Sequence, residues 1–412
     1  MTSNPVIRRA AWQSIPLIIV CGCLIAMLGF GPRSTLGFFL TPMSSANGWG
    51  RDVFALAIAL QMLLWGAAQP FIGAIADRFG PVLVLCIGAA LYAIGFTWMV
   101  FATTPTAMYL SAGVLIGFGL AGSSFTVVIG AFGKLLPVEW RTFSFGLGTA
   151  AGSFGQFLFS PLAIALNSAF DWHTTLLIFA GVILLILPLS LALAAPKNVE
   201  TPAQRAAQQS VGAAFHEALR HRSFVLLVLG FFSCGFQVFF VTVHLPAYLI
   251  DRGLSADLGA FTIGAIGLFN IVGSIGAGYL SNKMPKRYLL SLIYFFRAVA
   301  VAIFIAIPAT AATTIVFGAV MGLLWLSTVP PTNALVALMF GTRWLTMLAG
   351  FAFFSHQIGG FLGVWLGGLV FERTGSYDMI WWMFILLGLL SALINLPIKE
   401  APVAREAAAA TA

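Results

Sequence analysis

The sequence predicts an all-α polytopic membrane protein whose twelve transmembrane helices form two pseudo-symmetric six-helix bundles. Three observations lead to this prediction. Of the residues, 60% are apolar and only 8% are charged, a balance foreign to a water-soluble domain of 412 residues. Long apolar segments follow one another from end to end, and each can cross about 30 Å of hydrocarbon as a helix. Several glycine motifs of the first half also recur in the second half at a nearly constant offset.

The apolar segments give the order of the predicted helices. In the first half they fall at about 13–40, 53–76, 82–102, 107–132, 143–168 and 172–195. In the second half they fall at about 223–249, 259–281, 288–309, 312–335, 345–371 and 377–397. Each segment is long enough to span a bilayer at the α-helical rise per residue.

The longest hydrophilic stretch separates the two sets of six spans. It covers about 196–222 and ends in a predicted surface helix around 215–220. The predicted division is an N-terminal bundle at 1–195, a cytoplasmic linker at 196–222, a C-terminal bundle at 223–400 and a cytoplasmic tail at 401–412.

Basic residues predict the orientation. Counted alternately from the N-terminus, the loops on the side of Arg8 and Arg9 hold fifteen Lys and Arg residues. The opposite side holds three, which are Arg51, Arg252 and Arg373. Because basic loops stay in the cytoplasm, both termini are expected there. The net charge of +8 is therefore a topology signal and does not indicate nucleic-acid binding.

An internal repeat relates the two halves, as is common in transporters. The matching pairs are Gly73-x-x-x-Asp77-Arg78 with Gly278-x-x-x-Asn282-Lys283 and Gly113-x-x-x-Gly117 with Gly318-x-x-x-Gly322, both 205 positions apart, and Gly146 and Gly155 with Gly350 and Gly359, 204 positions apart. Any one pair is weak in a chain with 43 glycines, but three pairs in matching spans are strong evidence of duplication.

The twelve spans, the repeat and the motif Gly73-Ala74-Ile75-Ala76-Asp77-Arg78-Phe79-Gly80 together resemble the major facilitator superfamily over essentially the whole chain. In that family the motif ends with further basic residues, whereas Pro81-Val82 follow here. The resemblance implies two bundles that rock about a central cavity. Spans 1, 4, 7 and 10 would line the cavity, and spans 2, 5, 8 and 11 would flank it.

Charged residues at the cytoplasmic ends of the spans are predicted to form a gate. Asp77 ends span two, and Arg141 opens span five. We expect an Asp77–Arg141 pair that holds the cytoplasmic side closed and breaks on rocking. The predicted gating residues are Asp77, Arg78, Glu139, Arg141, Asn282 and Lys283. The alternative is that these residues only cap helix ends and mark the cytoplasmic face.

Arg33 is the sharpest candidate for a substrate ligand. It follows Gly29, Gly31 and Pro32 in span one, so the helix is expected to bend there and free backbone groups towards a cavity. A guanidinium can hold a carboxylate through two parallel hydrogen bonds. Alternatively, the long side chain could extend to the outer surface.

The interior of the predicted bundle is positively biased, which favours an anionic cargo. Arg33 and Arg297 are the only lysines or arginines inside the predicted spans, and the only acidic residue in them is Asp378, at the edge of the last span. Such cations are costly in hydrocarbon and therefore usually functional. The resemblance places span nine outside the bundle, so Arg297 is expected to bond backbone carbonyls or polar groups of a neighbouring helix.

Two histidines in the spans are candidates for carrying a proton. His356 lies in the middle of span eleven, where its repeat counterpart is Gly152. Imidazole in general titrates near neutrality, so this ring could pair with an anion when protonated, or it could be a buried neutral ring. His244 lies near the outer end of span seven, and packing is the favoured role for it.

Polar and aromatic residues on the lining and flanking spans complete the predicted substrate site. They are Gln61, Gln156, Asn270 and Trp325, with Trp65, Gln69, Ser123 and Ser124 as further candidates. An indole in a membrane helix can also serve packing alone.

Enzyme, metal and cofactor functions are not predicted. The four cysteines, Cys21, Cys23, Cys86 and Cys234, all fall within spans and are expected to be free thiols. The histidines and carboxylates form no cluster in the sequence that would suit a nucleophile–base set or metal ligands. No cofactor, metal or catalytic residue is therefore expected.

Two stretches resemble the bacterial relatives of the monocarboxylate and oxalate/formate porters. They are Arg33-Ser34-Thr35-Leu36-Gly37-Phe38-Phe39-Leu40-Thr41-Pro42-Met43, with Gly48-Trp49 after it, and Phe354-Ser355-His356-Gln357-Ile358-Gly359. The arginine that these relatives place in span eight is missing, and Asn270 lies about where it would fall. In the oxalate branch a lysine on span eleven helps to neutralise the substrate, and His356 occupies that region here. One fixed and one titratable positive charge suit a monoanion better than a dianion.

We therefore expect a secondary transporter in a bacterial inner membrane that moves a small organic monocarboxylate by alternating access. Proton symport is the expected coupling, with the proton on His356, on His244 or on the carboxylate itself. The alternatives are organic-anion exchange, uniport, or metabolite or drug efflux by a carrier of the same fold. The expected partners are the organic anion, the proton and the bilayer, without nucleic acid, and the carrier is expected to be a monomer.

Overall fold

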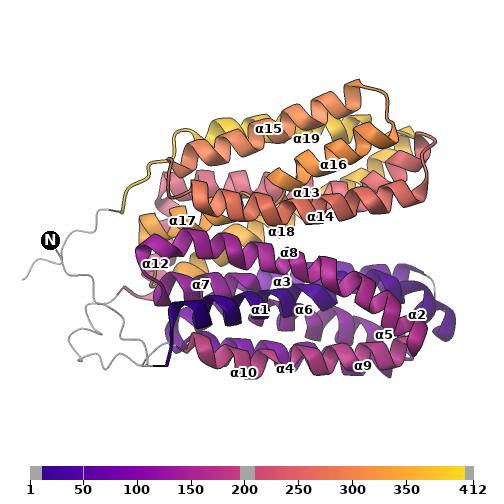
Figure 1. The fold of residues 1–412 in the computed structure, drawn as a ribbon, viewed down its shortest axis with the longest axis horizontal. Helices are drawn as coiled ribbons and strands as arrows, with labels where there is room; N and C mark the ends of the chain where they lie inside the picture. The colour runs from indigo at the N-terminus through magenta and orange to yellow at the C-terminus, as the bar shows by residue number, and fades with distance from the viewer. Residues whose placement is uncertain (1–11, 50, 195–208, 404–412) are drawn as a thin grey trace, which may run out of the picture.

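The computed structural model describes residues 12–49, 51–194 and 209–403. Arg8, Arg9, the first part of the predicted linker and most of the predicted tail lie outside these ranges. Within them, twelve helical spans are long and apolar enough to cross a membrane, which confirms the predicted number, and no strand is present. Figure 1 shows the spans of the first half in one group and those of the second half in another.

The first six spans follow the predicted order. Their helices are α1 (Ile15–Ser34), α3 (Arg51–Phe79), α4 (Pro81–Val100), α5 (Pro105–Met108), α6 (Ile116–Gly122), α7 (Phe125–Leu135), α8 (Val138–Ala169), α9 (Trp172–Ile183) and α10 (Ile186–Ser190). A short helix α2 (Leu40–Asn47) follows α1, and the π-helical segment Tyr109–Leu115 joins α5 to α6. Prolines at the first position of α4 and α5 favour helix starts there, since their missing N–H has no helical partner to lose.

The second half begins after the linker helix α12 (Val211–Arg220), which confirms the predicted surface helix. Its helices are α13 (Arg222–Asp251), α14 (Ala256–Leu280), α15 (Lys286–Ala306), α16 (Ala311–Leu324), α17 (Val329–Phe340), α18 (Leu345–Thr374) and α19 (Asp378–Asn395). The linker helix packs on this half, because Phe215 stacks on Phe351 with ring centroids 4.6 Å apart.

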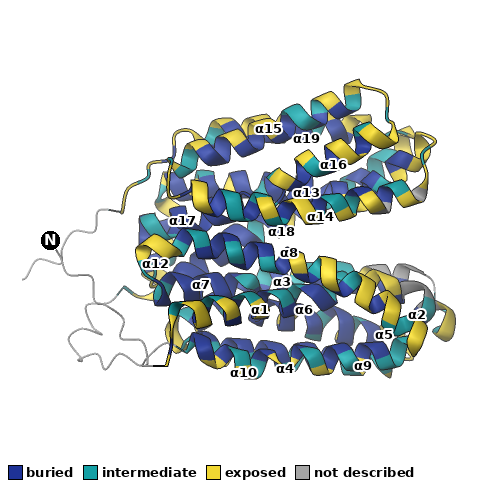
Figure 2. Cartoon of the chain, viewed as in Figure 1, coloured by how far each residue is buried: buried dark blue, intermediate teal, exposed yellow. Residues whose placement is uncertain are grey.

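Large apolar side chains cover the outer faces of the helices, as lipid contact requires. Figure 2 shows exposed residues along the outside of both groups and buried residues between the helices. Phe71, Phe261 and Trp382 are each more than 60% exposed. In water such a surface would be unfavourable, whereas in a bilayer it meets hydrocarbon.

Spans four and ten are both broken, at matching positions of the repeat. Ser123 and Ser124 separate α6 from α7, and residues 325–328 separate α16 from α17. The offset of 205 carries position 123 onto position 328, inside the second break. Unwound backbone at membrane depth needs polar partners inside the protein.

Side chains from span two satisfy the first break. Gln69 Nε2 donates to Ser124 Oγ at 3.0 Å, and Gln69 Oε1 accepts from Trp65 Nε1 at 3.2 Å. The same offset carries Trp65 and Gln69 onto Asn270 and Ser274, and these also bond each other, with Ser274 Oγ donating to Asn270 Oδ1 at 3.1 Å. The two halves therefore support their broken helices with corresponding residues of different chemistry.

Arg297 supplies a further cap in the second half. From α15 it donates through Nε to Leu324 O at 3.0 Å and through Nη2 to the carbonyls of Leu324 and Trp325. The side chain is fully buried. This confirms the prediction that Arg297 bonds backbone carbonyls of a neighbouring helix, where the negative end of the α16 dipole favours a cation.

The two halves touch at one end of the bundle, here called the terminal end, where α1 and α15 begin and α3 and α14 finish. Asn270 Nδ2 donates to Ser153 Oγ at 2.5 Å, and Gln357 Nε2 donates to Met62 O at 3.4 Å. Beyond these bonds, towards the opposite end, no hydrogen bond or ring contact joins the halves among the residues that the structure describes. Figure 1 likewise shows the groups converging at the terminal end and diverging at the other.

Glycines bring α13 and α18 into backbone contact along a seam. A Cβ on Gly235 would collide with His356 O, and one on Gly359 would collide with Phe232 O. A Cβ on Gly363 would approach Phe236 O to 2.5 Å. Side chains cannot fit at these points, so the two helices pack as closely as small residues permit.

Candidate functional site

Arg33 faces the interior of the first half. Its guanidinium carbon lies 5.1 Å from the ring centroid of Trp65 and 5.9 Å from that of Phe30, and Trp65 is only 2% exposed. Arg33 Nε is buried without a hydrogen-bond partner in the described ranges. The side chain thus stacks on aromatic rings and does not extend to the outer surface. The cation–π contacts hold the guanidinium while the Nε–H stays without a partner within the part of the chain that the structure describes.

An aromatic layer of Trp65, Phe125 and Phe353 bridges the two halves beside Arg33. Trp65 and Phe125 come from the first half, and their ring centroids lie 5.0 Å and 5.7 Å from that of Phe353 in α18. On the terminal side, the cavity lined by Phe125, Phe353 and Asn333 measures about 10 Å³, enough for about one water. The layer therefore closes the path between the halves towards the terminal end.

His356, in α18, contacts this layer from the C-terminal half of the protein. Its ring stacks on Phe353 at 5.7 Å with an interplanar angle of 10°, and the residue is 4% exposed. Nδ1 lies 3.4 Å from Gln357 Oε1, whereas Nε2 is buried and has no hydrogen-bond partner among the described residues. Arg33 and His356 therefore contact the same aromatic layer from opposite halves.

His244 is held by hydrogen bonds at both ring nitrogens. Nε2 lies 2.9 Å from Val364 O, which can only accept, so this nitrogen carries the hydrogen. Nδ1 then accepts from Tyr377 OH at 3.3 Å. Burial raises the pKa of the Tyr377 hydroxyl, so this group remains a donor at neutral pH. These bonds match the packing role that was favoured for His244.

Asn270 is fully engaged in bonds between helices. Besides its bond to Ser153 across the halves, its Oδ1 accepts from the backbone N–H of Leu326 at 2.9 Å. Asn270 therefore ties α14 to α8 and to the break in span ten. Its assignment as a substrate ligand stays a prediction, because a ligand would have to displace these partners.

Replacing Asn270 with alanine tests this position. We expect Asn270→Ala to destabilise the protein by about 2 kcal/mol, because the Leu326 N–H and the Ser153 hydroxyl both lose their partner. Thermal unfolding of the purified protein measures the loss. Ser153→Ala, which removes the bond between the halves together with the Ser153 bond to Thr149 O, is the matched control and should cost about half as much. Equal stability of Asn270→Ala and the wild type would contradict the structural role.

The remaining predicted ligands are spread over the interface. Trp325 is 8% exposed at the broken end of α16. Gln61 is buried in α3, donates to Ala112 O at 2.8 Å and has an unpartnered Oε1 among the described residues. Gln156 is half-buried on α8, one turn beyond Ser153 towards the opposite end. Each of these residues lies on a span that the family resemblance places at the central cavity or beside it.

The predicted Asp77–Arg141 pair is wrong, because Asp77 pairs with Lys134 in α7. Lys134 Nζ lies 2.6 Å from Asp77 Oδ1, while Arg141 Nε donates to the carbonyl of Leu136 at 3.0 Å. Lys134 sits in the last turn of α7 and reaches α3 directly, whereas Arg141 folds back over the short turn before α8. The sequence ranges for span four stopped before Lys134 and so concealed this neighbour.

Asp77 also joins the two halves at the terminal end. Its Oδ2 accepts from the backbone N–H of Met347 at 2.8 Å, in the first turn of α18. A carboxylate is favourable at a helix N-terminus because of the unpaired N–H groups and the helix dipole. Its repeat counterpart, Asn282, donates to Glu139 O in the first turn of α8 at 3.4 Å. The two contacts are equivalent in position, but only the first is charged.

The other predicted gating residues surround these contacts. Arg78 packs over Phe79 with 5.2 Å between the guanidinium carbon and the ring, and Lys283 lies 5.7 Å from the ring of Tyr279. Glu139 is exposed at the start of α8 and contributes its backbone carbonyl to the contact with Asn282.

The paired breaks in spans four and ten were not predicted from the sequence. The available signals were Ser123-Ser124 after a glycine-rich stretch and Pro330-Pro331 in the second half. Interrupted hydrophobic segments at corresponding positions of two repeats point to a transporter's binding region. Trp325 and the partners of Arg297 belong to this region.

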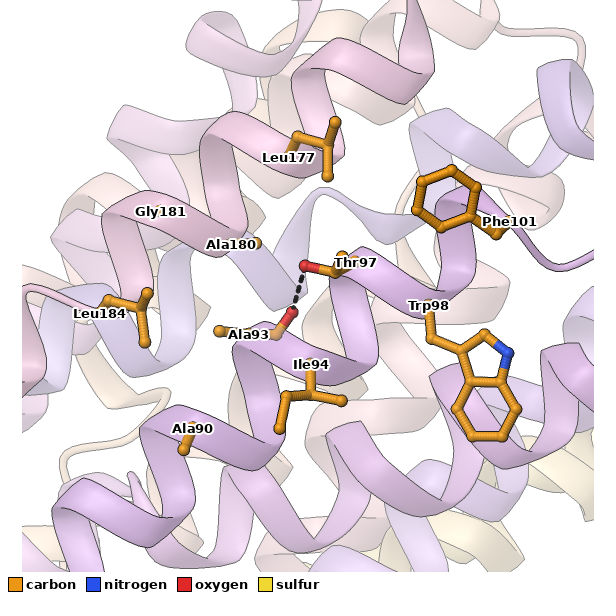
Figure 3. Close-up of a pocket in the computed structure, with 10 residues that line it drawn as sticks. All are labelled: Ala90, Ala93, Ile94, Thr97, Trp98, Phe101, Leu177, Ala180, Gly181 and Leu184. Atoms are coloured by element: carbon orange, nitrogen blue, oxygen red, sulfur yellow. Dashed lines mark hydrogen bonds between the residues drawn. The ribbon is translucent and has the colours of Figure 1, made fainter.

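A groove of about 570 Å³ lies between α4 and α9, away from the interface of the halves (Figure 3). Its lining is almost wholly apolar, and the Thr97 hydroxyl in it is already donated to Ala93 O at 2.9 Å. No cation faces it, so it is a poor candidate for an anion site.

Comparison with known proteins agrees with this architecture. Residues 22–364 match the Major Facilitator Superfamily. The chain is 28% identical to the uncharacterized MFS-type transporter YcxA of Bacillus subtilis, over 88% of this chain and 90% of that protein. It is 26% identical to monocarboxylate transporter 13 of Rattus norvegicus, over 92% and 88%. The crystal structure of the E. coli fucose:proton symporter FucP superposes with a TM-score of 0.71 at 16% identity, covering 93% of this chain and 98% of that one. The match to the family extends over most of the chain, and this protein therefore belongs to the Major Facilitator Superfamily.

Proposed function

We propose that this protein is a secondary transporter that moves a small organic monocarboxylate across a bacterial inner membrane by alternating access, coupled to proton symport. The observation that carries the proposal is Arg33, a guanidinium held on buried Trp65 with no carboxylate partner in the described ranges. An unpaired cation at membrane depth is costly unless a ligand uses it. A carboxylate is the ligand that a guanidinium binds best.

The relatives support the substrate class. One of them is named as a monocarboxylate transporter and aligns with this chain over most of its length. Arg33 supplies one fixed positive charge, and His356 supplies one that depends on protonation. This pair matches a single negative charge, so a monocarboxylate is favoured over a dicarboxylate.

The contacts between the halves support alternating access. They are confined to the terminal end and stop at the aromatic layer and at the Asn270–Ser153 bond. The excess of basic residues on that side supports a cytoplasmic location for it. The described conformation is then open outwards, and we propose that Asp77 and Asn282 form the cytoplasmic gate that must separate when substrate is released inwards.

Proton coupling is assigned to His356. Its buried Nε2 has no nitrogen or oxygen partner in the described part of the chain and adjoins the Cys234 thiol, whereas both nitrogens of His244 are engaged. An imidazole beside the substrate region can gain a proton with the anion and lose it on release.

Uptake by the purified protein in proteoliposomes tests the proposal. Radiolabelled lactate, pyruvate, formate and aromatic monocarboxylates are supplied outside, with and without an inward proton gradient. We expect concentrative uptake of at least one monocarboxylate only when the gradient is imposed, and thermal stabilisation by the same compound. Accumulation only against a preloaded anion would instead identify an exchanger, and extrusion of unrelated compounds would identify an efflux carrier.

A further inference from the structure

The fully buried Arg297 also has no carboxylate partner among the residues that the structure describes. Carbonyls of the broken span ten satisfy part of the guanidinium, and Gln237 Oε1 accepts from Nη1 at 3.1 Å. All these acceptors are neutral. A buried cation is usually paired with a formal negative charge, since desolvation is otherwise poorly offset.

Among the described neighbours of Arg297, Cys234 in α13 carries the side chain that can lose a proton and become an anion nearest to neutral pH. Arg297 Nη1 lies 3.4 Å from Cys234 Sγ, and the Thr328 hydroxyl lies 3.3 Å from the same sulfur. A guanidinium can only donate, so the sulfur must accept. A thiolate accepts far better than a thiol and is favoured beside an arginine.

His356 adjoins the same thiol from α18. The thiol and the imidazole are hydrogen-bonding neighbours, and His356 Nε2 is buried without a nitrogen or oxygen partner among the described residues. The other titratable groups facing the cluster are Arg297 and Tyr294, both from α15. No described carboxylate faces it from α13, α17, α18 or α19.

We propose that Cys234 is a proton-binding site, with its thiolate as the counter-ion of Arg297 and His356 as the relay between this site and the substrate region. The inference rests on the proposed function, because it names the group that stores the coupling proton. It differs from the assignment to His356 alone in placing the stored proton on sulfur.

The exchange conserves charge and protons. In the loaded state Cys234 is a neutral thiol with an S–H bond. The guanidinium of Arg297 then gives the cluster one net positive charge. On unloading, the S–H bond breaks and the proton forms an N–H bond at His356 Nε2. The resulting imidazolium then releases a proton. The thiolate and the guanidinium that remain neutralise each other. The loaded cluster therefore attracts a carboxylate, and the unloaded cluster does not.

The cluster also connects protonation to the broken helix. Arg297 holds the last carbonyls of α16, and Thr328 belongs to the break itself. When the thiolate becomes a thiol, Arg297 loses its anionic partner, so its bonds to Leu324 and Trp325 become its main stabilisation. Proton loading thereby strengthens the hold on span ten at the cavity.

Infrared spectroscopy of the S–H stretch tests the ionisation without any substrate. The chain has four free cysteines, so Cys21→Ser should lower the S–H band by about a quarter at acidic pH, where all four are thiols, and by about a third at alkaline pH, where three are. Cys234→Ser should leave the band unchanged at alkaline pH and lower it at acidic pH. An equal loss at all pH values would show that Cys234 is always a thiol and would overturn the proposal.

Transport assays with the same variants test the coupling. We expect Cys234→Ser to lose accumulation driven by a proton gradient while retaining substrate counterflow, which needs no net proton movement. Cys21→Ser, a buried thiol without a neighbouring cation, should retain both. Full gradient-driven accumulation by Cys234→Ser would overturn the proton site. A wild-type protein that moves no monocarboxylate would overturn the proposed function, while the S–H titration would still decide whether Cys234 ionises.

Discussion

Replacing Arg33 with glutamine is expected to reduce monocarboxylate uptake at low substrate concentration by about a hundredfold. Two charge-assisted hydrogen bonds to a carboxylate are together worth about 3 kcal/mol beyond neutral ones, which corresponds to about a hundredfold in affinity. Glutamine keeps a polar group over Trp65 but removes the charge and the fork of donors. Initial rates of uptake in proteoliposomes, measured over a range of substrate concentrations, give the change.

Two matched variants make the result specific. Arg33→Lys keeps the charge without the planar fork, and it should lose about tenfold because a single ammonium cannot bind the carboxylate bidentately. Arg252→Gln removes a cation from an exposed position, where the side chain lies 3.9 Å from Asp378, and should leave uptake unchanged. If Arg33→Gln transports as well as the wild type, the substrate assignment is wrong.

Asp77→Asn should open the terminal end of the protein. The substitution keeps the shape of the side chain but removes the charge shared between Lys134 Nζ and the Met347 N–H. We expect a loss of about 2 kcal/mol from the closed arrangement, or about a thirtyfold shift between the two conformations. Ala349→Cys is introduced into a variant whose natural cysteines have been replaced. Its accessibility measures the opening, because Ala349 is only 4% exposed in the closed arrangement. Maleimide labelling of this cysteine should become faster.

The repeat provides the control for this prediction. Asn282→Ala removes the equivalent contact, but that contact is a neutral bond of 3.4 Å and should matter much less. Labelling at position 349 should therefore rise strongly in Asp77→Asn and only slightly in Asn282→Ala. An equal effect of the two substitutions would contradict a charge-based gate.

The fold was largely predictable because the length and the apolar composition of each span can be read from its own stretch of sequence. The sequence predicted spans at 13–40 and 377–397, and the structure has Ile15–Phe39 and Asp378–Asn395. The repeat was also visible, since its glycines mark positions where backbones approach closely, as Gly73 does with Thr346. Such steric requirements leave few residue types, so they can be found without coordinates.

The contacts of the site were less predictable because they depend on which helix faces which. Asp77 was expected to meet Arg141, yet Lys134 is nearer, and the Met347 N–H comes from 270 residues away. The breaks in spans four and ten were missed, because serine, proline and glycine also occur in continuous membrane helices. The position of Arg297 outside the central path was predicted from the family resemblance, whereas its neighbour Cys234 carried no local signal.

The glycine seam between α13 and α18 has a mechanical consequence. Where the main chains touch, no change of side-chain rotamer can absorb a displacement. We therefore expect α13 and α18 to move together as one rigid unit. A displacement of either helix near His356 is then carried along α18 to its first turn, where the Met347 N–H donates to Asp77. Protonation or ligand binding near His356 can thus affect the distant contact between Asp77 and Met347 through movement of α18.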